Sequence, residues 1–163
     1  MRSRAALGTH PLHPAMVSLP IGSLFLAFVA DVIHALTKNP LFYDVALFAI
    51  GVGIITALLA AVLGLIDYFG VKMSAAGRRL ATIHMLLNIA AVALYAISWV
   101  MRRYHAALET PRWPLAFGLE VVPFLMLGVS GWLGGKMSYE HKIGVVEWID
   151  PEAREIGMRE AAR

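Results

Sequence analysis

The sequence predicts an all-α membrane protein: an antiparallel bundle of four transmembrane helices with short loops and a short C-terminal tail helix. Of its 163 residues, 59% are hydrophobic and only 15% are charged, and the mean hydropathy is +0.68. This balance differs strongly from that of an ordinary soluble domain. Four apolar stretches each reach the roughly 20 residues that a helix needs to cross a bilayer.

The four stretches run at about 16–36, 42–69, 80–101 and 114–135. Short connections between them place consecutive helices antiparallel. We expect residues 1–146 to form one transmembrane domain that includes the N-terminal segment, and residues 147–163 to form a cytoplasmic tail. The chain contains no cysteine, which excludes disulfides, thiolate metal sites and cysteine catalysis.

A His-Pro-x-His-Pro unit, formed by residues 10–14, precedes the first apolar stretch. Proline restricts its own φ and disfavours the helical region for the residue before it. We therefore expect His10 and His13 on a stiff, non-helical backbone that presents them as ligands. Asp31 and His34 follow near the other end of the first helix, where polar groups normally face the bundle interior.

The second and third stretches each carry an inward-facing stripe. Small residues spaced four, three and four apart occupy positions 53, 57, 60 and 64 of the second stretch, and a further step of three reaches Asp67. Such a stripe allows close approach of a neighbouring helix, so Asp67 should point into the bundle. In the third stretch, His84 is followed on one face by Asn88, Ala91, Tyr95 and Ser98. Arg102 and Arg103 are expected to emerge into the loop that follows.

The fourth stretch carries Glu120 and Pro123 in its first half and glycines at positions 128, 131, 134 and 135. Glycine permits close approach of a neighbour or a ligand. Glu140 and His141 come directly after this stretch, so they return to the end of the bundle where the chain begins.

Antiparallel packing of the four helices therefore predicts a polar cluster at one end, made of His10, His13, Asp67, His84, Glu140 and His141. Imidazole ligates haem iron and also binds Fe, Zn or Cu ions. We expect His10, His13, His84 and His141 to bind the cofactor, with Asp67, Asn88 and Glu140 as supporting groups, or with Asp67 as a direct metal ligand. A structural His84–Asp67 hydrogen bond is an equally good explanation for that pair. Asp31, His34, His105 and Glu120 gather at the other end. For Asp31 and Glu120 the favoured interpretation is a hydrogen-bonded pair that ties helices together, and for His34 and His105 it is a solvated or interfacial side chain.

The basic residues indicate topology rather than nucleic-acid binding, because they are spread over the flanks of the helices and no nucleic-acid motif accompanies them. One side carries Arg2, Arg4, Lys72, Arg78, Arg79, Lys136 and Lys142, and the other carries Lys38, Arg102, Arg103 and Arg112. The richer side is expected in the cytoplasm, with both termini.

Several motifs together resemble a bacterial membrane-protein family known as domain of unknown function 2231. They are the His-Pro-x-His-Pro unit, Gly64-Leu65-Ile66-Asp67-Tyr68, His84, Gly131-Trp132-Leu133-Gly134-Gly135, His141 and Gly144-Val145. His34 and His105 lie outside the pattern. The resemblance implies a four-helix protein of the bacterial inner membrane for which no activity is established. It also implies partnership with redox proteins, since similar domains occur fused to cytochrome c or Rieske modules.

These observations lead to three hypotheses. The first is a small membrane redox protein that binds b-type haem at the cytoplasmic end and takes part in electron transfer. The second is a non-haem Fe, Zn or Cu site held by the same histidines with Asp67. The third is a structural or accessory subunit of a larger membrane complex or oligomer. The sequence contains no catalytic triad, phosphate loop or nucleotide fingerprint, so whether the protein is an enzyme stays open.

Overall fold

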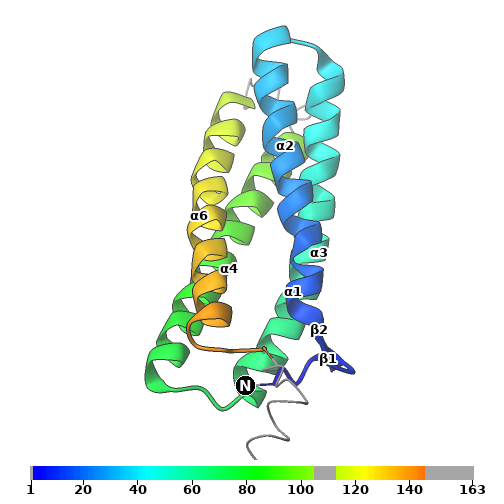
Figure 1. The fold of residues 1–163 in the computed structure, drawn as a ribbon. Coiled ribbons are helices and arrows are strands. Elements are labelled where there is room, and N and C mark those ends of the chain that lie inside the picture. The colour runs from blue at the N-terminus through cyan, green and yellow to red at the C-terminus, as the bar shows by residue number, and fades with distance from the viewer. Residues whose placement is uncertain (1, 105–112, 146–163) are drawn as a thin grey trace, which may run out of the picture.

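Two helical hairpins, packed side by side, make up the bundle (Figure 1). The structure is a computed structural model that describes residues 2–104 and 113–145. The first hairpin joins α2 (Ser18–Thr37) to α3 (Pro40–Gly70), and the second joins α4 (Ala75–Arg103) to α6 (Trp113–Tyr139). Contacts are most extensive within each hairpin and sparser between α3 and α4 and between α2 and α6. The predicted tail, residues 147–163, lies outside the described residues.

Among the described residues, four helical segments are long and apolar enough to cross a membrane: Leu12–Thr37, Pro40–Gly70, Ala75–Arg103 and Pro114–Tyr139. Each contains one predicted stretch and extends a few residues beyond it. Large apolar side chains such as Phe48, Leu58 and Trp132 are exposed along them, as expected for surfaces that face lipid tails. The predicted four-helix membrane bundle is therefore confirmed.

The N-terminal segment differs from the prediction. Strands β1 (Ala6–Leu7) and β2 (His10–Pro11) pair antiparallel, and Gly8 enters the turn between them with a φ of 62°, a conformation that glycine adopts without steric cost. A short helix, α1 (Leu12–Met16), follows directly. His13 is therefore helical, not extended, because Pro14 lies in the first turn, where a helix needs no N–H donor.

The interior is built from small residues and a few large side chains. Leu24, Ala27, Ala49, Ile50 and Tyr95 form the buried apolar core. The small-residue stripe of α3 faces neighbouring helices as predicted: a Cβ at Gly53 would lie 2.5 Å from the Leu24 side chain, and one at Gly64 would lie 3.0 Å from the His13 ring.

Candidate functional site

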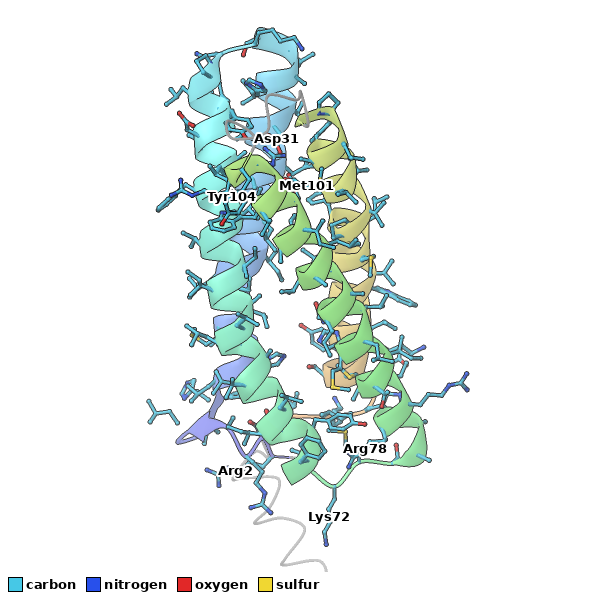
Figure 2. The ribbon with its side chains drawn as sticks, turned by 180° about the vertical axis from the view of Figure 1, so that it is seen from behind. Arg2, Asp31, Lys72, Arg78, Met101 and Tyr104 are labelled. Atoms are coloured by element: carbon cyan, nitrogen blue, oxygen red, sulfur yellow. The ribbon has the colours of Figure 1, made fainter. Side chains whose placement is uncertain are left out.

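Two polar sites lie inside the bundle, one towards each end. The N-terminal end carries the β1–β2 hairpin and the turn between α3 and α4, and the far end carries the turn between α2 and α3 (Figure 1). Figure 2 shows Arg2, Lys72 and Arg78 at the N-terminal end, and Asp31 with Met101 and Tyr104 towards the far end.

The first site is a pair of facing imidazoles, His13 on α1 and His84 on α4. Their ring centroids lie 6.5 Å apart and their planes are nearly perpendicular, at 88°. His13 lies on α1, which packs against α3 of the first hairpin, and His84 belongs to the second hairpin, so the pair spans the seam between the two hairpins. The structure thus brings together two of the four histidines that the sequence singled out.

Both rings are anchored through Nδ1 to a helix carbonyl. His13 Nδ1 lies 2.8 Å from the carbonyl oxygen of Ala60, and His84 Nδ1 lies 2.9 Å from that of Ser130. A carbonyl oxygen can only accept, so these contacts favour a proton on Nδ1 and a lone pair on Nε2. His84 Nδ1 also lies 2.9 Å from the Ser130 hydroxyl, which can donate or accept. A proton on Nδ1 is the tautomer that a metal-binding Nε2 requires.

Asn88 adds a third polar group to the pair. Its side-chain nitrogen lies 2.6 Å from the Ser130 hydroxyl, 2.8 Å from the His84 carbonyl oxygen and 3.1 Å from His84 Nε2. Gly134 leaves room for the ring, since a Cβ at that position would lie 3.5 Å from His84 Cε1. His84, Asn88 and Ser130 thus form one connected network between α4 and α6.

The other predicted site residues lie elsewhere. Asp67 accepts hydrogen bonds from the backbone N–H groups of Arg4 and Ala5, at 2.6 and 2.9 Å, and its two carboxylate oxygens lie 2.8 and 2.7 Å from the Ser3 hydroxyl. Its described contacts fasten the N-terminal segment and include no histidine. The small-residue face that led to Asp67 was correctly predicted, but the partners of this carboxylate were not.

His10 is exposed on β2, opposite Leu7. His141 is half-buried near the start of α4, where a Cβ at Gly77 would lie 3.8 Å from its Nδ1. Glu140 is exposed and lies 3.6 Å from Lys136. Within the described part of the chain, no three His, Asp or Glu side chains come together in a way that could hold a metal ion.

The second site is a fully buried charge cluster towards the far end, with one charged side chain from each of α2, α4 and α6. The Arg102 guanidinium binds Asp31 through both oxygens, Nη1 to Oδ1 at 2.9 Å and Nη2 to Oδ2 at 2.6 Å, and Nη2 also lies 2.7 Å from Glu120 Oε1. All three side chains have 0% exposure. The predicted tie between helices at this end therefore exists.

The prediction for Arg102 was wrong: its side chain is fully buried inside the bundle, the residue as a whole is only 3% exposed, and it does not emerge into the loop. The sequence carried a signal that was missed: Arg102 follows Ser98 by four residues and so continues the inward stripe of α4. Ser98 is itself part of the cluster, because its hydroxyl donates to Glu120 Oε1 at 2.8 Å. Of the other polar residues predicted at this end, His34 packs against Tyr43 and His105 lies outside the described residues.

Together the fold and these sites define a polytopic membrane protein: a four-helix bundle with polar groups enclosed towards both ends. Comparison with protein families matches residues 9–147 to the family described as "Predicted membrane protein (DUF2231)". This chain belongs to that family, since the match covers most of its length. No curated protein and no solved structure matches the chain.

Proposed function

We propose that this chain is a small membrane redox protein that holds one b-type haem between His13 and His84 and passes electrons to a protein partner. The observation that carries the proposal is the pair of facing imidazoles across the seam between the hairpins, each anchored through Nδ1. Of the four histidines considered from the sequence, the proposal uses these two.

The donor set suits haem iron. Imidazole is a common axial ligand of haem, and an Nδ1–H bonded to a carbonyl is the usual way in which a protein orients such a ligand. His13 Nε2 has no hydrogen-bond partner among the described residues. Within the described part of the chain, the hydrogen-bond partner of His84 Nε2 is Asn88, whose amide has two further acceptors and can release it.

The spacing of the rings would allow both to hold one metal. Their centroids lie 6.5 Å apart, and metal–imidazole nitrogen distances are about 2 Å, so His13 and His84 would be the two residues that hold the iron.

The seam between the hairpins also carries an apolar groove, whose lining includes neither His13 nor His84. The groove, of about 380 Å³, runs between α2 and α6, lined by Ile21, Phe25, Phe124, Leu125, Leu127, Gly128 and Gly131. A side chain at Gly128 or Gly131 would meet nothing within 4 Å. Since helices pack most closely within each hairpin, opening the seam would leave both hairpins intact.

When bound, haem would supply reversible one-electron chemistry. The residues of this chain would hold the iron through His13 and His84, orient the rings through Ala60 and Ser130, and keep water away with the apolar seam. Cytochrome c or Rieske-type proteins are the partners we propose. Membership of the family adds no activity to this argument.

We further propose that the protein lies in the bacterial inner membrane with its N-terminal end in the cytoplasm. The basic residues at that end of the bundle lie before β1, in the turn between α3 and α4, and at or just beyond the ends of α4 and α6: Arg2, Arg4, Lys72, Arg78, Arg79, Lys136 and Lys142. Because Arg102 is buried, the opposite flank has one exposed basic residue fewer. The difference in Lys and Arg content between the two flanks, on which the positive-inside rule depends, is therefore larger.

The decisive experiment is an absorption spectrum of the purified full chain, oxidised and reduced, after haem has been supplied during expression. We expect a Soret band with the reduced bands of a low-spin haem bound by two imidazoles. His13→Ala and His84→Ala should each lose this spectrum, whereas His10→Ala and His141→Ala should keep it.

Absence of a Soret band in the wild type, or its survival in both His13→Ala and His84→Ala, would contradict the proposal. Metal analysis on the same samples distinguishes the alternatives. Stoichiometric Fe, Zn or Cu without porphyrin would favour a non-haem site, and no cofactor at all would favour an accessory subunit.

A further inference from the structure

A pocket with three basic side chains opens at the N-terminal end of the bundle, and its lining shares no residue with the two polar sites. It has a volume of about 540 Å³, and Arg2, Arg4 and Lys72 line it. Arg2 and Arg4 precede β1, and Lys72 follows the end of α3, so two distant parts of the chain supply the cations. Figure 2 shows Arg2 and Lys72 at this end of the molecule. Among the described residues, the lining contains no Asp or Glu.

We propose that this basic pocket binds the phosphate group of an anionic phospholipid, whose acyl chains lie along the exposed face of α3. Arg and Lys are the side chains with which proteins bind phosphate oxygens. The pocket lies where a lipid headgroup would meet the protein, because Gly70, which also lines it, is the last residue of the span formed by α3.

Two of the three cations are held in place by the backbone. Arg2 Nη2 donates to the carbonyl oxygen of Gly8 at 2.6 Å, and Arg4 Nε donates to that of Gly70 at 3.2 Å. Gly70 also leaves room for the stem of Arg4, because a Cβ at that position would lie 2.6 Å from Arg4 Cγ. Each described contact uses one nitrogen of a guanidinium, which has five N–H donors, so the other donors can bind phosphate oxygens. Side chains fixed in this way lose less freedom when a ligand binds.

The carboxylate of Asp67 does not cancel the charge of the basic pocket. Asp67 accepts hydrogen bonds from the Ser3 hydroxyl and from the backbone N–H groups of Arg4 and Ala5, and so holds the segment that carries two of the cations. With Asp67 counted, three cations still stand against one carboxylate among these described groups. A local excess of positive charge at the membrane surface attracts anionic lipids, and it repels the ammonium group of a zwitterionic lipid.

The exposed apolar face of α3 favours a lipid over a free anion. Leu59, Val62 and Ile66 are 53%, 58% and 47% exposed. Steps of three, four and four residues place them in one row with Gly70, so an apolar row within the span ends at the basic pocket. A free phosphate would use the cations alone, whereas a phospholipid also covers the row with its acyl chains. A charged pocket that continues into an apolar row matches an amphipathic ligand.

The test is native mass spectrometry of the purified full chain, which counts the lipid molecules that stay bound when detergent is removed. The probes are phosphatidylglycerol and phosphatidylcholine with identical acyl chains. We expect the wild type to bind phosphatidylglycerol more tightly. Arg4→Gln and Lys72→Gln should each weaken this binding about fivefold, and the double variant about 25-fold. Arg79→Gln is the matched control, because Arg79 is an exposed cation at the same end of the bundle and does not line the pocket; it should change the affinity less than about twofold.

Equal binding of the two lipids by the wild type would overturn the proposal, whatever the variants do. An equal loss of phosphatidylglycerol binding in Arg79→Gln and in the pocket variants would also overturn it, because the attraction would then be spread over the whole basic end. Inorganic phosphate and glycerol phosphate carry the same charged group without acyl chains. If either displaces phosphatidylglycerol at an equal concentration, the pocket binds a water-soluble phosphate and the assignment to a lipid is wrong.

Discussion

Replacing Asp67 with alanine separates two roles for this carboxylate, a clamp on the N-terminus or a support for the histidines. In the structure it binds the Ser3 hydroxyl and the N–H groups of Arg4 and Ala5. Ser3 and Ala5 are buried, at 5% and 7% exposure, whereas Arg4 is exposed. Removing the carboxylate therefore leaves two buried donors unpaired.

An unsatisfied buried donor costs about 1–3 kcal/mol, so the loss of two should reduce the docking free energy of the N-terminal segment by roughly 2–6 kcal/mol. Since 1.4 kcal/mol corresponds to a factor of ten, the local opening equilibrium should rise by about 30-fold or more. Hydrogen–deuterium exchange with mass spectrometry, read on the peptide that covers residues 3–12, measures this rise directly.

The exchange of the transmembrane helices should change little in this variant, because the loss is local. Asp44→Ala, which removes an exposed carboxylate from the same helix, is the control and should leave the peptide unchanged. Unaltered exchange of residues 3–12 in Asp67→Ala would refute the clamp. If Asp67→Ala lost the proposed haem spectrum without faster exchange of residues 3–12, Asp67 would instead support the histidine site.

Three further predictions concern stability and topology. Arg102→Ala should destabilise the bundle by about 3–5 kcal/mol, because it leaves buried carboxyl groups without their cation. Unfolding in detergent measures this loss, and Arg103→Ala is the control at an exposed position. Equal stability of the two variants would contradict the buried network. Gly53→Ala should lower the free energy of unfolding by about 1–3 kcal/mol, because the added methyl group overpacks against Leu24. Position 128 faces the open groove, so Gly128→Ala should leave the stability nearly unchanged. If Gly128→Ala were the more destabilising of the two, the helices would pack differently. Reporter fusions should place the turn between α3 and α4 in the cytoplasm and the turn between α2 and α3 outside, and the opposite pattern would invert the proposed topology.

The helices and their inward faces could be read from the sequence because both depend on local properties. Bilayer thickness sets the length of an apolar stretch, and helical periodicity decides which residues share a face. Tyr95 and Ser98 are accordingly buried, and the stripe that contains His84 and Asn88 does face a neighbouring helix. The same rule, extended by one step, would have placed Arg102 in the interior.

The partners of the polar groups could not be read in this way. Each polar contact joins residues that are far apart in the sequence. His84 contacts Ser130, 46 positions away, and Asp67 contacts Ser3, 64 positions away. Arg102 binds Asp31, which is 71 positions away. Which groups meet depends on the rotation and height of each helix against its neighbour, and packing of side chains across the whole bundle sets both. Placing His10, His141 and Glu140 at the same end of the bundle was therefore insufficient to bring them into one site.

By itself, then, the sequence determined that this chain crosses the membrane four times and which helix faces turn inward, because hydropathy and periodicity are properties of each segment alone. Only the tertiary structure decided that His13 pairs with His84, that Asp67 fastens the N-terminus, and that one arginine serves two buried carboxyl groups. Those contacts arise from the packing of one hairpin on the other, and no single segment contains that information.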